Sequence, residues 1–182
     1  MLITSDPRQY MARFTLKNEK EVLIRMIRPE DEALMVRFHQ TLSEESVYYR
    51  YLYPLKLSER IDHECLRRIC HIDCEKEIAL VAEYRSTFEA EPEILGVGRL
   101  SKLGGADDAE FALAVSNAWQ NLVLPGEVLK LLVAFGQRAK LRRILGHILP
   151  ENHTMQHVCR KARFKLEHDA DRHDHLAVHE GD

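Results

Sequence analysis

The 182-residue sequence predicts an α+β (mixed α/β) domain in which helices flank a mostly antiparallel central sheet. Three observations support this class: helical patterns fill residues 30–71, three strand patterns follow one another over 78–116, and the remaining segments alternate between helix and strand. The composition, 45% hydrophobic and 30% charged, is that of an ordinary globular protein. The length fits one domain, which we expect at residues 21–179 after a polar leader over residues 1–20.

The first part of the chain predicts one strand followed by three helices. Residues 21–28 alternate apolar and polar side chains, the period of a half-buried strand. Pro29 ends this strand, and the acidic residues that follow it favour a helix N-terminus, with the helix continuing to about residue 40. Ser43 and Ser58 are suitable N-cap residues for two further helices, which we expect to reach residues 53 and 71.

Strand patterns dominate the middle of the chain. Apolar-rich runs at 78–84 and 94–103 surround a polar tip, which predicts an antiparallel hairpin, and a glycine-rich turn connects it to a third strand at 110–116. Apolar residues at helical spacing then indicate an amphipathic helix over 126–141. The remaining expected elements are a strand at 144–149, a helix from 150 to 162, and closing strands at 164–167 and 176–179. This order implies one parallel crossover late in the chain.

Charge is unevenly distributed along the chain. Residues 130–165 carry nine basic side chains and one acidic side chain, a net charge of +8, whereas the rest of the chain carries −11. The basic segment can attract phosphate groups, while the acidic remainder argues against a nucleic-acid partner. No apolar run approaches the roughly 18 residues of a membrane span, and no signal peptide is visible. We therefore expect a cytoplasmic protein without a membrane partner, with its four cysteines as thiols.

Four segments in a fixed order carry a family resemblance. They are IRMIRPEDEALMVRFHQTLSEESVYYRY, CHIDCEKEIALVAE, AEFALAVSNAWQ and ILPENHTMQHVCRKARF, and the resemblance that they carry covers about residues 22–178. In this order they resemble the GNAT superfamily of N-acetyltransferases, in particular its bacterial protein lysine acetyltransferase branch. The resemblance implies the GNAT fold, acetyl-CoA as co-substrate, and an amine or protein-lysine acceptor.

The resemblance also implies where the coenzyme binds. In the family, backbone groups of one strand hold the pantetheine arm, and the loop after that strand, with the pattern Q/R-x-x-G-x-G/A, holds the pyrophosphate. This sequence departs from the loop pattern, because Val123 and Pro125 replace two small residues, and Pro125 has no N–H to donate. The residues expected to bind the coenzyme are Leu113, Val115, Gln120, Asn121, Leu122, Val123, Leu124, Gly126 and Asn152.

Three residues are candidates for the chemistry by the same resemblance. Glu110 occupies the position of the general base, which must remove a proton from an alkylammonium before its nitrogen can attack; the alternative is an exposed acid after Asp107 and Asp108. Asn152 matches an asparagine that contacts substrate or pantetheine, or it caps a helix. Cys159 stands where many members have a tyrosine that protonates the CoA thiolate, or it is a packed helix cysteine.

Two further hypotheses remain open. Val123 and Pro125 also fit a degenerate GNAT-fold binding or regulatory module with weak or no acyl transfer, and a homodimer is left open for either function. A metal sensor is the third hypothesis, based on two groups of potential ligands, but neither has the paired spacing of structural zinc sites, so we expect no metal. These groups are His63, Cys65, Cys70, His71 and Cys74, and His168, Asp169, Asp171, His173, Asp174 and His175.

Overall fold

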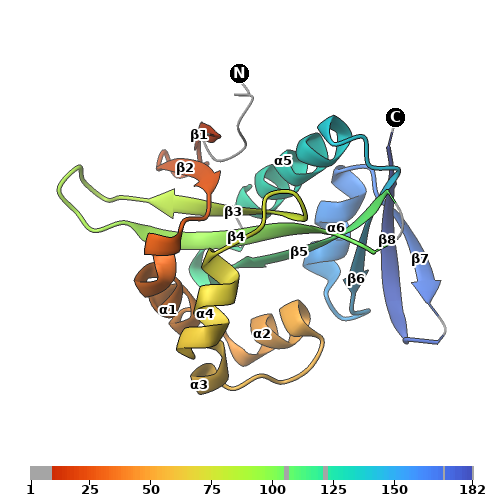
Figure 1. Cartoon of the computed structure of the whole chain (residues 1–182), viewed down its shortest axis with the longest axis horizontal. Coiled ribbons are helices and arrows are strands. Elements are labelled where there is room, and N and C mark those ends of the chain that lie inside the picture. Colours follow the sequence, from red (N-terminus) through yellow and green to blue (C-terminus); the bar gives the residue numbers. More distant parts are fainter. Residues whose placement is uncertain (1–9, 105–106, 121–122, 170, 182) are drawn as a thin grey trace.

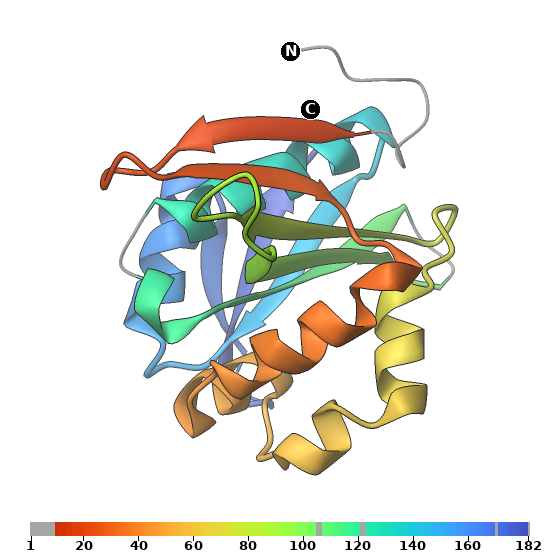
Figure 2. The same ribbon diagram turned by 90° about the vertical axis from the view of Figure 1, so that its left-hand side faces the viewer.

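The computed structural model describes residues 10–104, 107–120, 123–169 and 171–181, which form an eight-stranded sheet with helices on both faces (Figures 1 and 2). The strands are β1 (Met11–Thr15), β2 (Glu21–Met26), β3 (Glu77–Tyr84), β4 (Glu93–Lys102), β5 (Asp108–Val115), β6 (Arg143–Ile148), β7 (Lys165–Asp169) and β8 (Asp174–Glu180). The α-helices are α1 (Glu32–Gln40), α2 (Glu44–Tyr51), α3 (Leu57–Arg60), α4 (His63–Cys70), α5 (Leu124–Arg138) and α6 (His153–Lys161). Short 3-10 helices, η2 (Pro29–Asp31) and η3 (Asn117–Trp119), complete the set.

The sheet confirms the predicted class and topology. Its strand order is β1-β2-β3-β4-β5-β6-β8-β7, and β5 with β6 is the one parallel pair among the described strands. Helix α5 makes the crossover between these two strands, as the late change from strand to helix pattern predicts. Among the described residues no helix combines the length and apolar character needed to cross a membrane; the longest, α5, has 15 residues.

Two regions differ from the expected elements. Residues 11–15, which we expected in the leader, form β1 and pair with β2, and the flanking Tyr10 and Leu16 are buried. The five-residue strand is too short for its alternation to stand out from a polar context. The helix expected from Ser58 to residue 71 is divided into α3 and α4, because Asp62 starts a new helix by accepting a hydrogen bond from the Glu64 N–H (3.1 Å).

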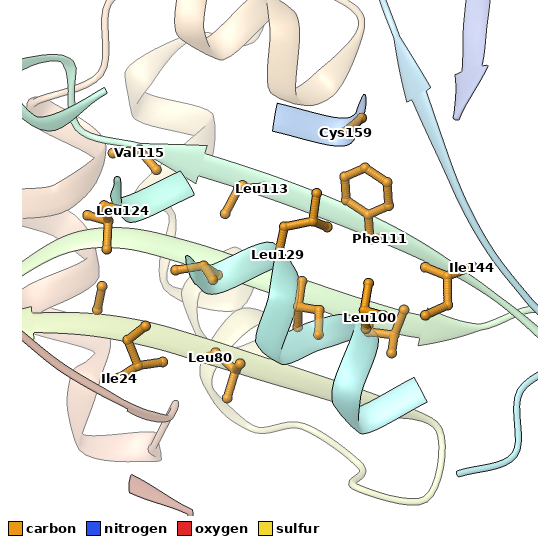
Figure 3. Close-up of a cluster of buried hydrophobic side chains, with 14 of the residues drawn as sticks. Ile24, Leu80, Leu100, Phe111, Leu113, Val115, Leu124, Leu129, Ile144 and Cys159 are labelled. Carbon is orange, nitrogen blue, oxygen red and sulfur yellow. The ribbon is translucent and has the colours of Figure 1, made fainter. Parts of the chain in front are cut away.

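The apolar core lies in two clusters, one on each face of the sheet. One cluster packs α5 and α6 against the sheet, and Figure 3 shows its side chains from β2 to β6 turned toward α5. The other cluster packs α1, α2 and α4 on the opposite face. Gly98 allows α5 to approach β4, since a Cβ at this position would overlap the Val128 side chain. This close packing fixes the position of the α5 N-terminus relative to the end of β5.

A buried ion network joins β2, β3 and the start of the first helical segment. The Arg25 guanidinium donates two hydrogen bonds to the Asp31 carboxylate (both 2.7 Å) and one to Glu83 (2.8 Å). Burial opposes the charge on Glu83, but hydrogen bonds from Arg25 and Arg85 outweigh it and lower the pKa of Glu83. All three members are under 10% exposed, so removing one leaves a buried charge without its partner.

Candidate functional site

Strands β5 and β6 separate partway along their length. Their parallel pairing joins Asp108 with Arg143, Ala109 with Ile144, and Glu110 with Leu145. Beyond Glu110, β5 stays paired with β4 as far as Val115, and β6 stays paired with β8 as far as Ile148. Within the described part of the sheet, the second half of β5 therefore has a strand on one side only.

The unpaired side of β5 presents backbone groups of alternate residues. The Ser116 N–H donates to the Leu95 carbonyl of β4 (2.8 Å), so the even-numbered residues of β5 direct their backbone N–H and C=O groups toward β4. Leu113 and Val115 have the opposite parity and direct theirs toward the gap. The Val115 carbonyl already accepts a hydrogen bond from the Gln120 side chain (2.9 Å). The N–H groups of Leu113 and Val115 are thus oriented toward the space between β5 and β6, which suits an amide-containing chain.

A cavity of about 290 Å³, here named the slot cavity, lies where β5 ends and α6 begins. Asn152 borders it and also caps α6, because its Oδ1 accepts a hydrogen bond from the Met155 N–H (3.0 Å). Both sequence-based interpretations of Asn152, the cap and the site residue, are therefore compatible with its position. The lining comprises Glu45, Ser46, Tyr49, Leu113, Ala114, Val115, Gln120, Pro125, Glu151, Asn152, His153, Thr154 and Met155.

A second cavity of about 600 Å³, named the basic cavity, lies between the N-terminal turn of α5 and helix α6. It adjoins the slot cavity, since both are lined by Gln120, His153 and Thr154. Its one acidic lining residue, Glu127, accepts a hydrogen bond from Lys130 (2.7 Å). The full lining is Lys17, Gln120, Val123, Gly126, Glu127, Lys130, His153, Thr154, His157, Val158, Lys161 and Ala162. Three lysines against one glutamate favour an anionic ligand.

The two residues that depart from the family loop pattern, Val123 and Pro125, border different cavities at the start of α5. Pro125 is buried and borders the slot cavity, whereas Val123 is 38% exposed and borders the basic cavity. Leu124 belongs to the apolar core (Figure 3). A Cβ on Gly126 would meet no atom within 4 Å, so this position leaves the first turn open toward the basic cavity. Among the residues that the structure describes, no side chain caps α5, and its first-turn N–H groups can receive an anion.

Two residues expected to bind the coenzyme, Asn121 and Leu122, lie outside the described residues. They connect Gln120 to Val123, both of which line the basic cavity. Of the other seven expected residues, six therefore line the two adjoining cavities, and the seventh, Leu124, lies in the core.

Glu110 lies at the point where β5 and β6 separate. Its half-buried side chain belongs to the face of β5 that carries Ala112 and Ala114, opposite the core face of Phe111 and Leu113. Its negative charge acts on the guanidinium of Arg50. A carboxylate at this position can accept a proton from an amine that approaches the slot cavity from this face.

Cys159 is packed in the core, which favours the second of its two sequence-based interpretations. The residue is 0% exposed and belongs to the apolar cluster under α5 and α6 (Figure 3). Burial raises the pKa of its thiol to about 12. The linings of the slot and basic cavities do not include Cys159. The interpretation as a packed helix cysteine is therefore the one that fits its surroundings.

Sequence reasoning missed Tyr49, which borders the slot cavity from α2. Its hydroxyl donates a hydrogen bond to the Glu45 carboxylate (3.0 Å). Desolvation raises the pKa of Tyr49, and the negative charges of Glu45 and Glu151 raise it further. The sequence gives no signal for this residue, because α2 contains four aromatic or apolar positions and only the fold shows which one faces the cavity.

The two clusters of potential metal ligands make other contacts. His63 and His71 both lie beside Glu32 (3.3 and 3.4 Å), and His147 Nδ1 lies 3.1 Å from the buried Asp174 carboxylate. Over the part of the chain that the structure describes, no three His, Cys, Asp or Glu side chains are grouped so as to hold a metal ion.

Comparison with known families gives one match over most of the chain. The family model described as "Acetyltransferase (GNAT) domain" matches residues 21–165. This range includes the separated strands, the start of α5 and helix α6. The match therefore covers every residue expected to bind the coenzyme or to take part in the chemistry.

Solved structures show the same architecture. The GNAT domain of S. lividans PAT superposes with a TM-score of 0.83 at 23% identity, over 97% of this chain and 99% of that chain. The ribosomal-protein-S5-alanine acetyltransferase from Vibrio fischeri gives 0.70 at 14% identity, over 94% and 97%. The PaiA N-acetyltransferase from Thermoplasma acidophilum, solved in complex with coenzyme A, gives 0.67 at 15% identity, over 87% and 98%. At these identities the likeness establishes a shared fold.

Proposed function

Because this chain belongs to the GNAT acetyltransferase family, we propose that it transfers an acetyl group from acetyl-CoA to an amine such as a protein lysine. Members of the family use acyl-CoA, and acetyl-CoA would supply the thioester whose carbonyl carbon the amine attacks. The attack is direct: a C–N bond forms, the C–S bond breaks, and the thiolate leaves with the electron pair. The reaction requires no covalent enzyme intermediate.

The residues around the two cavities fit the coenzyme. The outward N–H groups of Leu113 and Val115 suit the amides of a pantetheine arm in the slot cavity, beside Asn152. The pyrophosphate is assigned to the loop over residues 120–126, where the open turn at Gly126 borders the basic cavity. Lysine side chains around this cavity add positive charge that compensates for the N–H missing at Pro125.

Glu110 is assigned as the general base. An ammonium group cannot attack while its lone pair is protonated, so the acceptor must first transfer a proton to a carboxylate or to a water held by it. Glu110 is the last residue of β5 that pairs with β6, and the slot cavity is lined by residues further along β5. The same strand therefore carries the carboxylate and borders the cavity. Tyr49 borders the slot cavity, whereas Cys159 is buried in the core, so the Tyr49 hydroxyl is the better placed proton donor for the leaving thiolate.

The observation that carries this proposal is the separation of β5 from β6 beside two adjoining cavities, one of them basic. The test is release of coenzyme thiol from acetyl-CoA in the presence of lysine-containing peptides, with acetylated peptide detected by mass spectrometry. We expect both products in equal amounts. Coenzyme binding without either product, across a broad panel of amines, would exclude the transferase.

A binding or regulatory module is the second candidate, favoured by Val123 and by the absent N–H of Pro125. Such a module would form a stable complex or homodimer and would leave acetyl-CoA unchanged. Sizing by light scattering together with the coenzyme titration separates the two functions. The cytoplasmic location and the absence of a nucleic-acid partner stay predictions.

A further inference from the structure

A third cavity, of about 400 Å³, lies on the opposite side of β5 from the apolar core under α5. Helices α1, α2 and α4 and strands β3 to β5 enclose it, and we name it the arginine cavity. It is lined by Met35, Phe38, His39, Leu42, Arg50, Tyr51, Cys65, Arg68, Ile69, Glu77, Val97, Arg99 and Ala114. Its position places it beside the residues assigned to chemistry, because Ala114 also lines the slot cavity.

Arg50 is a half-buried cation that lines this cavity. Its guanidinium lies 4.9 Å from the centre of the Tyr51 ring. Among the described residues it has no hydrogen-bond acceptor and no ion pair. Burial lowers the pKa of Arg50, and the nearby positive charge of Arg99 acts in the same direction. A guanidinium in this situation gains stability from an added anion, since it offers a planar fork of donors to a carboxylate or phosphate.

The other charged groups of the cavity leave its positive charge in excess. Arg99 donates to the Glu77 carboxylate (2.8 Å) and to the Ile69 carbonyl (2.6 Å), so Glu77, the one acid in the lining, is already paired. Arg68 adds a further positive charge at the cavity. His39 contributes none near neutral pH, because burial lowers its pKa to about 4.

We propose that the arginine cavity binds a carboxylate or phosphate group of the acetyl acceptor through Arg50, while the amine of the same acceptor lies beside Glu110. This inference rests on the proposed function and specifies its substrate class: an amine with an anion close to it. Arg50 and Glu110 interact electrostatically, so the two ends of such an acceptor would meet charges of opposite sign. The anion belongs either to a small amino acid or amine phosphate, or to an acidic side chain beside a lysine.

The test is a set of calorimetric titrations with matched pairs of amines, without coenzyme present. The small-molecule pairs are β-alanine with β-alaninamide, and phosphoethanolamine with ethanolamine. The peptide pair is Gly-Lys-Glu-Gly with Gly-Lys-Gln-Gly, both with blocked ends. We expect the anionic member of at least one pair to bind the protein about tenfold or more tightly than its neutral match. The pair that shows this preference identifies the source of the anion.

Two variants assign the preference to Arg50. Arg50→Gln should remove the preference and Arg50→Lys should restore part of it, whereas Arg67→Gln, an exposed α4 residue outside the cavity lining, should retain it. Circular dichroism checks that each variant is folded. Equal affinities within every pair, no binding of any anionic member, or a preference that survives in Arg50→Gln would each overturn the inference. A separate titration with acetyl-CoA tests the proposed function, and failure of the wild-type protein to bind acetyl-CoA there would overturn it. The two failures are distinguishable, because the amine titrations contain no coenzyme.

Discussion

Glu110 and Leu145 are the last residues that pair β5 with β6 before the two strands separate. Glu110 therefore lies where the gap between the two strands begins, and the backbone groups of Leu113 and Val115 lie further along β5 beside this gap. The same strand thus positions a carboxylate and a row of N–H groups on a rigid element. This arrangement allows the proposed base and the proposed coenzyme contacts to be tested separately.

Glu110→Gln should lower kcat by about 100-fold or more while leaving the Kd for acetyl-CoA within about twofold. The amide has nearly the shape of the carboxylate but cannot accept the proton of the acceptor ammonium. Initial rates of thiol release and a coenzyme titration provide the two measurements. Asp107→Asn, an exposed acid beside the start of β5, is the control and should retain wild-type turnover. Unchanged kcat in Glu110→Gln across the pH range would remove this residue from the base role.

At Gly126 a methyl group should be compatible with folding, whereas a large side chain should interfere with coenzyme binding. Gly126→Ala should raise the unfolding free energy by about 0.5 to 1 kcal/mol, because the added Cβ meets open space and alanine favours the helix. Gly126→Leu should fold but weaken coenzyme binding by about tenfold or more, since its side chain extends toward the basic cavity. Gly104→Leu, at another open glycine outside both cavities, serves as control. Equal affinities of Gly126→Leu and the control would contradict the assignment.

Gly146 should not tolerate even a methyl group. A Cβ at this position of β6 would lie 2.6 Å from the Phe111 Cζ atom, 2.7 Å from Cδ1 and closer still to Cε1. Gly146→Ala should therefore lower the unfolding free energy by about 1 to 3 kcal/mol, the range for an overpacked core. Urea denaturation measures this value, with Gly126→Ala as the glycine whose substitution has the opposite sign. Wild-type stability in Gly146→Ala would show that β5 and β6 do not pack as described.

Cys159→Ala should leave catalysis nearly unchanged and lower stability. The buried thiol fills core volume, so its loss should lower the unfolding free energy by about 1 kcal/mol. Turnover should stay within about threefold of wild type. In the folded protein, a thiol reagent at pH 8 should leave Cys159 unmodified, because burial raises its pKa to about 12. A fall in kcat of about 100-fold in a folded Cys159→Ala variant would restore the proton-donor role.

The buried ion network of Arg25, Asp31 and Glu83 should make the unfolding free energy fall as the pH becomes acidic. Glu83 has a folded-state pKa below its usual value of 4.5, because hydrogen bonds from Arg25 and Arg85 outweigh burial. Its contribution to stability is therefore present above pH 4.5 and is lost as the pH falls through the lowered folded-state pKa. Glu83→Gln should show a smaller loss of unfolding free energy than wild type between pH 6 and pH 3. Parallel curves for the two proteins would contradict the coupling.

Periodicity was sufficient to predict most of the elements. The late crossover, the β3–β4 hairpin and the amphipathic α5 all follow from local patterns, because each element buries one regular face. Strand β1 was missed because its five residues alternate too briefly within a polar context. The interpretation of Asn152 as a helix cap was also accessible, since capping depends only on neighbouring residues.

The positions of Arg25, Arg50 and Cys159 depended on the fold. Arg25 lies in a strand whose alternating pattern predicts an exposed or half-buried side chain at this position. In the structure it is buried, where it donates a hydrogen bond to Glu83 of the neighbouring strand. Arg50 is one of several polar residues on α2, and only the packing of this helix over β5 brings it within electrostatic range of Glu110. Cys159 matched a catalytic position in the sequence, but the direction of its side chain into the core is a property of how α6 packs.

Isothermal titration of the protein with acetyl-CoA tests the central claim most directly. If the gap between β5 and β6 and the basic cavity form one coenzyme site, binding should saturate at one molecule per chain, weaken with added salt, and be displaced by coenzyme A itself. The absence of saturable heat at millimolar acetyl-CoA, with the protein shown to be folded, would contradict the account.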